Sequence, residues 1–168
     1  MRPFGLSCFP RFLVLLLLPC LLLGCRAQGV TAKAVLSAIC KEEASLPAGA
    51  FYWLSSEEDK ERPSDALLAA AFGEGSPPSS LFEVEDAAFF FSYTQTCEFS
   101  VFLCKRASGT EAVSKMCLHR LEQLKNAFGE ENLPPALKSA TVVTRGRWVL
   151  LCVSTDAQNA LRAFRRAI

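Results

Sequence analysis

One cysteine near the N-terminus stands where a thiol can take part in a defined reaction. Leu22-Leu23-Gly24-Cys25 resembles a bacterial lipobox, in which small or apolar residues precede a cysteine whose thiol accepts diacylglycerol before the chain is cleaved. That chemistry needs a thiol nucleophile at the membrane surface and a small residue at the cleaved position, and Cys25 and Gly24 supply both. The pattern therefore predicts lipidation of Cys25.

The segment before Cys25 has the layout of an export signal. Residues 1–11 carry two basic side chains and no acidic one, and residues 12–23 are almost wholly apolar. A basic region followed by a short apolar stretch is typical of a signal peptide, whereas a membrane-spanning helix needs roughly 20 apolar residues. The predicted division of the chain is a lipoprotein signal peptide, a lipidated cysteine with a short tether, and a single domain: residues 1–24, 25–30 and 31–168.

Two other fates of the N-terminal segment stay open. A signal peptidase could cut after Ala27 and release a soluble secreted protein, or the segment could remain as an uncleaved anchor. All three fates export the domain. We expect it to lie on the extracytoplasmic face of the cell membrane, held there by lipid, with secretion as the alternative.

Charge gives no argument for a nucleic-acid partner. Removal of 24 of the 168 residues leaves 144, enough for one domain with a sizeable core. The chain has 18 basic and 17 acidic residues, and loss of Arg2 and Arg11 with the signal leaves a net charge of −1. A nearly neutral chain without a basic run lacks the positive surface that phosphate backbones require. We expect no nucleic acid and no metal, and the lipid itself as the contact with the membrane.

Five cysteines remain once Cys8, Cys20 and Cys25 are set aside. They are Cys40, Cys97, Cys104, Cys117 and Cys152. There is no Cys-x-x-Cys motif, and the single His119 does not complete a zinc-like ligand set. The simplest interpretation is that these cysteines are small buried hydrophobic residues. A disulfide, within the Cys97–Cys104 segment or across adjacent strands, is the alternative that an exported location permits.

Residues that could carry catalysis or bind a ligand are few. The chain has no Gly-x-Ser-x-Gly, no Ser-x-x-Lys and no Gly-rich phosphate loop. His119 falls off the apolar side of its helix, and Cys97 beside Glu98 is the best candidate for an activated thiol. Neither pattern indicates an enzyme. A small-ligand pocket would need aromatic lining, for which the candidates are Phe51, Tyr52, Trp53 and Trp148.

The first half of the domain predicts two helices and one short strand. Thr31 can cap a helix that continues to about Ser45, and Pro47 and Gly49 end it. Residues 51–54 form a compact aromatic run, typical of a strand. An Ala/Leu-rich helix follows over Asp65–Phe72, and Gly73 closes it.

The second half predicts two β-hairpins, each followed by a helix. The first pairs strands at residues 82–93 and 98–105, and Ser108 with Glu111 has the spacing of a capping box for the next helix. The second pairs strands at 140–144 and 147–154 around Arg145-Gly146. Thr155 is expected to cap the last helix.

From Glu98 to the C-terminus the chain resembles a known family. The matching residues are Glu98-Phe-Ser-Val-Phe102, Arg120-Leu-Glu122, the segment from Ala140 to Asp156, and the closing Ala160 to Phe164. These resemble the uncharacterised lipoprotein-like proteins grouped as domain of unknown function 4358, found mainly in Gram-positive Firmicutes. The resemblance implies an exported, often lipid-anchored small domain and implies no known reaction.

Together these patterns predict an α+β domain and a binding function. We expect a mainly antiparallel sheet made from two β-hairpins, with helices packed on one face. The expected function is non-enzymatic binding or scaffolding of an envelope protein near the membrane, without a cofactor. A small-ligand-binding lipoprotein is the alternative, and a soluble secreted enzyme comes after it.

Overall fold

The structure is a computed structural model that describes residues 29–168. The predicted signal peptide and Cys25 lie outside the described residues. Five α-helices and five strands make up the described part of the chain. In order they are α2 (Ala32–Glu42), β1 (Gly49–Trp53), α3 (Asp65–Phe72), β2 (Val84–Ser92), β3 (Glu98–Cys104), α4 (Thr110–Phe128), α5 (Pro135–Lys138), β4 (Thr141–Arg145), β5 (Trp148–Val153) and α6 (Ala157–Ala167).

The strands form one antiparallel sheet in the order β1-β2-β3-β5-β4. The predicted α+β class and antiparallel sheet are therefore confirmed. Both predicted hairpins form, β2–β3 and β4–β5, and α4 and α6 follow them in the chain. Gly146 takes φ 60° in the tight β4–β5 turn, a conformation that favours glycine. The two hairpins meet at the centre of the sheet, where β3 pairs with β5.

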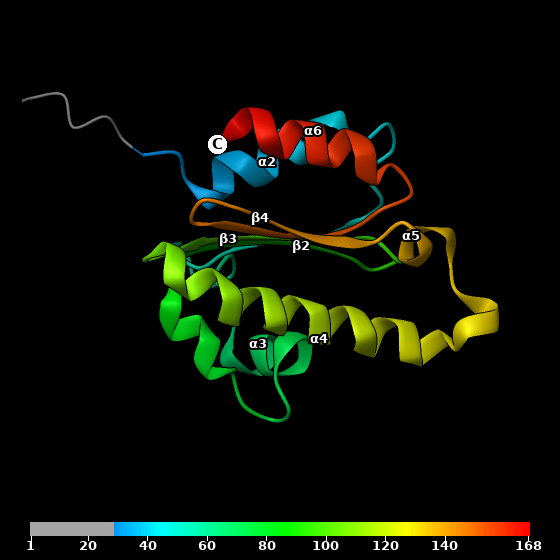
Figure 1. The fold of residues 1–168 in the computed structure, drawn as a ribbon, viewed down its shortest axis with the longest axis horizontal. Helices are drawn as coiled ribbons and strands as arrows, with labels where there is room; N and C mark the ends of the chain where they lie inside the picture. Colours follow the sequence, from blue (N-terminus) through cyan, green and yellow to red (C-terminus); the bar gives the residue numbers. More distant parts are fainter. Residues whose placement is uncertain (1–28) are drawn as a thin grey trace, which may run out of the picture.

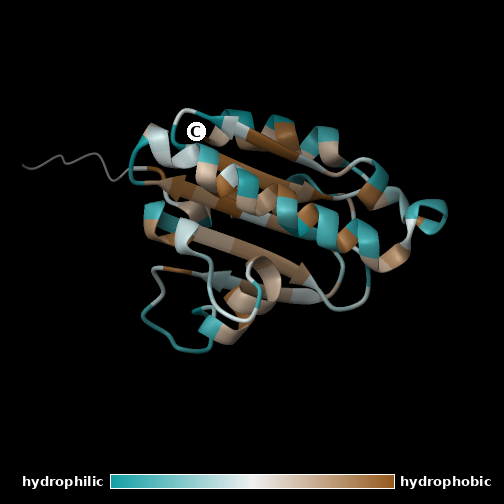
Figure 2. Cartoon of the chain, turned by 60° about the horizontal axis from the view of Figure 1, so that its bottom comes forward, coloured by the Kyte–Doolittle hydropathy of each residue, from teal (hydrophilic) through white to brown (hydrophobic). Residues whose placement is uncertain are grey.

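The helices cover both faces of the sheet, not one face as the sequence predicted. Figure 1 shows α2 and α6 on one side and α3 and α4 on the other. The reason lies in β3, which is buried along its whole length. A strand with apolar residues at successive positions exposes an apolar surface on each face, and each surface needs a cover. Figure 2 shows the central strands hydrophobic along their length, while the helices carry hydrophilic residues outward.

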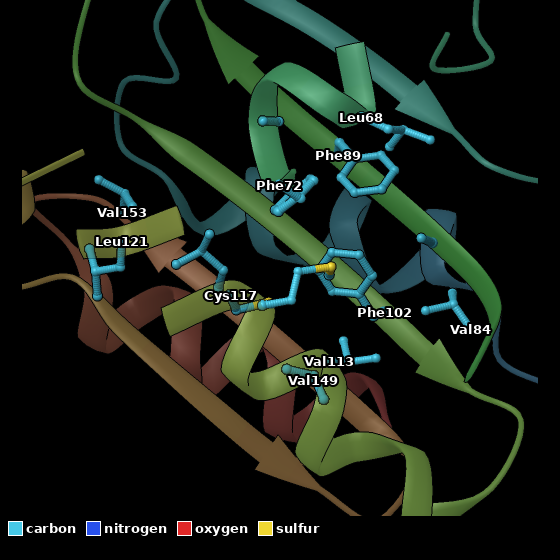
Figure 3. Close-up of a cluster of buried hydrophobic side chains, with 14 of the residues drawn as sticks. Leu68, Phe72, Val84, Phe89, Phe102, Val113, Cys117, Leu121, Val149 and Val153 are labelled. Carbon is cyan, nitrogen blue, oxygen red and sulfur yellow. The ribbon is translucent and has the colours of Figure 1, made fainter. Parts of the chain in front are cut away.

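Two separate cores result. The core beneath α3 and α4 is built around Phe72, Phe89 and Phe102, whose ring centroids lie 5.4 to 5.7 Å apart (Figure 3). The core beneath α2 and α6 contains Phe90, Phe99 and many small aliphatic side chains. Complete burial of one phenylalanine side chain is worth about 2 kcal/mol. The aromatic residues are thus committed largely to stability.

The predicted helix start at Thr31 agrees with the structure, whereas the predicted starts at Ser108 and Thr155 do not. Thr31 accepts a hydrogen bond from the Ala34 amide at 3.2 Å, as predicted for a cap. The predicted capping box at Ser108 is wrong, because a short 3₁₀ turn (Ala107–Gly109) precedes α4 and Glu111 binds Lys115 instead. Thr155 does not cap α6 either. The helix begins after Asp156, whose amide donates to Ser154 Oγ.

Candidate functional site

A cavity of about 260 Å³ lies at one end of the sheet. Four segments that are distant in sequence form its walls: the end of α2, the β2–β3 turn, the start of α5 and the β5–α6 loop. We call this end of the molecule the cavity end. The lining residues belong to these ranges: 43–45 with Pro47, 95–97, 134–136 and 154–156.

Local hydrogen bonds hold these walls in place. Ser92 Oγ accepts from the amides of Thr94 and Gln95 at 3.2 and 3.1 Å, which tightens the β2–β3 turn. The same hydroxyl donates to the Ala48 carbonyl. On the other wall, Ser139 Oγ donates to the Ser154 carbonyl at 2.6 Å. Serine hydroxyls that bind nearby backbone groups favour turns of this kind.

The cavity carries acidic groups and no basic one among its described lining residues. Glu43 Oε1 accepts a hydrogen bond from Ser154 Oγ at 2.9 Å, and Asp156 accepts one from the Asn159 amide group. Burial raises the pKa of the Glu43 carboxyl, the Ser154 hydrogen bond lowers it, and the negative charge of Asp156 raises it again. Two carboxylates in one recess favour a cationic group as ligand.

A second, smaller cavity of about 110 Å³ adjoins the first and shares residues 95–97 with it. The buried Glu98 carboxylate lies there with Arg120 of α4. Arg120 Nη2 and Nε donate to Glu98 Oε2 at 3.0 and 3.2 Å, and Ser100 Oγ donates to Oε1. Burial raises the pKa of Glu98, and the charge and hydrogen bonds of Arg120 act in the opposite direction. This carboxylate is satisfied within the protein.

The candidate thiol at Cys97 does not have the setting of a nucleophile. Cys97 packs against the core under α2 and α6, whereas Glu98 points to the α4 face, so the two do not form a thiol–base pair. Burial, followed by the charges of Glu43 and Glu98, raises the pKa of the Cys97 thiol to about 12. A reactive cysteine needs a lowered pKa.

The remaining predicted chemical groups are also placed apart. His119 is exposed on α4, where its ring lies 3.0 Å from the Gln123 amide nitrogen and 3.6 Å from a Glu74 oxygen. Within residues 29–168, no group of three or more His, Cys, Asp or Glu side chains could hold a metal ion. In the same part of the chain, no helix has both the length and the apolar character that crossing a membrane requires.

The four aromatic residues predicted as pocket lining do not come together. Phe51, Trp53 and Trp148 pack against the core under α2 and α6, and Tyr52 packs against the opposite core. Strand alternation in β1 explains the division, because successive side chains point to opposite faces. Lys33 Nζ lies 3.8 Å from the centroid of the Trp53 ring. None of the four lines either cavity at the cavity end.

The five cysteines within residues 29–168 are free thiols in this structure. Two belong to the core under α3 and α4, and the other three belong to or pack against the core under α2 and α6. Cys104, Cys117 and Cys152 are fully buried, which confirms their interpretation as small buried hydrophobic residues. A Cys97–Cys104 disulfide is ruled out because the two residues lie at opposite ends of β3. Seven residue steps of about 3.3 Å each separate them by about 23 Å, and a disulfide needs Cα atoms within about 7 Å.

Sequence reasoning did not single out Glu43, Ser154 or Asp156 as site residues. Glu43 sits in an ordinary charged run at a helix end, and Ser154 reads as the last residue of a strand. The Pro134-Pro135 pair was the one sequence signal near the cavity, since two consecutive prolines interrupt regular secondary structure before α5.

No family model, no curated protein and no solved structure matches the chain. The resemblance to domain of unknown function 4358 stays a prediction. The fold and the site together define an exclusively antiparallel α+β domain with an acidic cavity at one end of its sheet.

Proposed function

We propose that this is an exported protein, anchored by lipid on Cys25, that binds a protein partner near the membrane without catalysis. The observation that carries the proposal is the cavity end, where Glu43 and Asp156 line a recess without a basic side chain among its described residues. A lysine or arginine side chain of a partner would supply the missing positive charge. This charge pattern supports the cavity end as the surface that would meet an envelope protein.

The distribution of apolar residues supports binding at this end. Among residues 29–168, most large apolar side chains are buried in the two cores, and the exposed ones are few: Val30, Phe82, Tyr93, Leu118 and Phe128. They come from separate segments of the chain. A hollow with two carboxylates and no basic side chain among its lining residues is a more specific recognition feature than single exposed apolar residues, which are normal on protein surfaces.

Helix α2 separates the cavity from the proposed anchor, because the chain enters the helix at one end of the sheet and reaches the cavity at the other. Ala32 donates its amide to Asp86 Oδ2, which places the start of α2 at the end of the sheet opposite the cavity. Eleven helical residues span about 16 Å. With a five-residue tether, the partner would be met within about one domain diameter of the bilayer, on the side away from the anchor.

A small cationic ligand is the second candidate. Four chain segments surround the recess, and its volume of about 260 Å³ is just below the roughly 300–1,000 Å³ of typical small-molecule pockets. A metabolite with one amino or guanidino group fits the same charge pattern. This alternative keeps the anchor and changes only the occupant.

The anchor is tested by substituting Cys25. We expect Cys25→Ala to abolish labelling with radioactive palmitate and to release or stall the protein, because the thiol that accepts the lipid is gone. Cys20→Ala, in the apolar segment that precedes Cys25, is the matched control and should keep both labelling and membrane retention. Unchanged labelling and retention in Cys25→Ala would contradict the proposed lipidation.

The identity of the molecule that binds at the cavity end, a partner protein or a small cation, is tested by chemical crosslinking and purification of the intact anchored protein from its own cells. The expected result is a specific crosslinked partner that is lost in the Glu43→Gln/Asp156→Asn variant, in which both cavity carboxylates are neutral. Mass spectrometry of the denatured eluate detects any retained small molecule. A retained small cation without a partner protein would favour the second candidate and refute scaffolding.

A further inference from the structure

Three of the five described cysteines gather at the cavity end, on the face covered by α2 and α6. Cys40 belongs to the last turn of α2, Cys97 ends the β2–β3 turn, and Cys152 lies in β5. All three belong to the core under α2 and α6 or pack against it. Cys152 is explained as a buried hydrophobic residue, but neither the anchor nor the acidic recess explains the two half-buried thiols, Cys40 and Cys97.

Two contacts place Cys40 near Cys97. The Glu43–Ser154 hydrogen bond of 2.9 Å holds the end of α2 over the end of β5. Cys40 precedes Glu43, the residue just after α2, by three residues, so the two lie on the same side of the helix end. Glu98 pairs with Val153, and one further step of this register sets Cys97 opposite Ser154. Glu43 therefore links the helix that carries Cys40 to the strand end beside Cys97.

The three thiols differ in access and in geometry. Cys97 lines both cavities and is half-buried, as is Cys40, while Cys152 is fully buried. In the continued register Cys97 and Cys152 are diagonal neighbours on adjacent strands, whose Cα atoms lie about 7–8 Å apart. A disulfide needs Cβ atoms about 3.5–4.5 Å apart. The sheet holds Cys152 too far away, whereas Cys40 lies on α2, outside the register of the sheet, and packs against the same core as Cys97.

We propose that Cys40 and Cys97 are a disulfide-forming pair that joins the end of α2 to the β2–β3 turn, two walls of the cavity. The proposal rests on export to an oxidising compartment and does not depend on partner binding. The oxidant is an external disulfide of the glutathione type or of a thiol oxidase.

The exchange proceeds in two balanced steps. Cys97 loses its proton, and its thiolate, a minor species because the pKa is raised, slowly attacks one sulfur of the external disulfide. This step releases one external thiolate and leaves a mixed disulfide on Cys97. The Cys40 thiolate then attacks the Cys97 sulfur and releases the second external thiolate. The protein loses two protons and two electrons, and the external disulfide is reduced to two thiols.

The surroundings of the pair indicate a structural crosslink and not a catalytic one. Burial raises the pKa of both Cys40 and Cys97 to about 12, and nearby negative charge acts in the same direction. A thiol of high pKa is a poor leaving group, so its disulfide is reduced slowly. The crosslink would fix the distance between Glu43 and the β2–β3 turn, and with it the width of the recess.

The test is disulfide mapping of the full-length protein. The chain is expressed with its own leader in an exporting bacterium, quenched in acid, alkylated under denaturing conditions and digested without reduction. We expect one linked peptide pair that contains Cys40 and Cys97, while Cys104, Cys117 and Cys152 are alkylated. Purified reduced protein exposed to oxidised glutathione should give the same pair.

Substitutions separate this pair from other pairings. Cys40→Ser and Cys97→Ser should each abolish the linked peptide and leave the remaining partner alkylated, while Cys104→Ser, in the other core, should keep it. Complete alkylation of both Cys40 and Cys97 in the exported and the glutathione-treated protein would overturn the proposal. A Cys97–Cys152 link would overturn it as well.

Discussion

Two glutamates at the same end of the sheet, on opposite faces, differ in how their charge is met. Glu98 is buried beneath α4, where Arg120 and Ser100 bind it. Glu43 lines an open recess and receives a hydrogen bond from one hydroxyl, that of Ser154. The first carboxylate is closed within the protein, and the second can still accept a donor from outside.

What covers each carboxylate explains the difference. On one face, Arg120 in the middle of α4 lies over Glu98, and α4 continues beyond it to Phe128. On the other face, α2 ends at Glu42, so no further residue of α2 covers the space beyond it. A carboxylate beneath a continuing helix is buried and paired, whereas one just past a helix end borders a recess. Under the proposed function, stability and binding lie on opposite faces at one end of the molecule.

The largest effect on stability is expected when the buried ion pair between Glu98 and Arg120 is broken. Arg120→Met should lower the free energy of unfolding by about 3 kcal/mol, because it leaves a buried carboxylate without its counter-charge. Urea denaturation at pH 7 measures this loss. The Glu98→Gln/Arg120→Met double variant should recover part of it, and a double variant as unstable as the single one would contradict the pairing.

The same variant gives a pH dependence whose sign is fixed. Burial already raises the pKa of Glu98, and loss of Arg120 removes the groups that oppose this rise. A carboxyl with a raised pKa in the folded state binds a proton on folding, so stability increases as pH falls toward its unfolded pKa. The stability deficit of Arg120→Met should therefore be smaller at pH 5 than at pH 8. A deficit that grows on acidification would refute this account.

At Glu43, we expect a substitution to weaken partner binding while it leaves the stability of the fold nearly unchanged. Glu43→Gln should change the free energy of unfolding by less than about 1 kcal/mol, since the amide can keep the Ser154 hydrogen bond. The affinity for the partner should fall about tenfold, which corresponds to about 1.4 kcal/mol. Denaturation curves together with a binding isotherm check both values. A large loss of stability with unchanged affinity would make Glu43 a structural residue like Glu98.

The smallest effect is the pH dependence of binding. Burial raises the pKa of Glu43, so this carboxyl takes up its proton at a higher pH than an exposed glutamate. Affinity for a cationic partner should decline as pH falls through that pKa, and Glu43→Gln should flatten the curve. Identical pH profiles for the two proteins would show that the Glu43 charge plays no part in recognition.

Much of the fold followed from local patterns, and the site did not. Thr31, the span Asp65–Phe72 and the Gly146 turn were predictable because each depends on neighbours within a few residues. The cover on both faces was missed, although β3 carries apolar residues at successive positions. The predicted capping box at Ser108 was wrong because Ser108 belongs to the 3₁₀ turn that precedes α4.

The recess could not be predicted because its walls come from four distant segments. Glu43 and Ser154 are 111 residues apart, and nothing in either local sequence indicates that they meet. The aromatic run at Phe51–Trp53 was the more conspicuous candidate, yet strand alternation divides it between the two cores. The lipidation of Cys25 lies outside the described residues and stays a prediction from the sequence.

The central claim, that the cavity end is the surface that meets the partner, is tested most directly by site-specific photocrosslinking in cells. A photoreactive residue is placed at Gln95, which is exposed and lines both cavities, or at Asp59, exposed in the loop after β1. The full-length anchored protein should give a discrete crosslinked product from Gln95 that disappears with Glu43→Gln/Asp156→Asn, and none from Asp59. A product from Asp59 alone, or one from Gln95 that survives loss of both carboxylates, would contradict the claim.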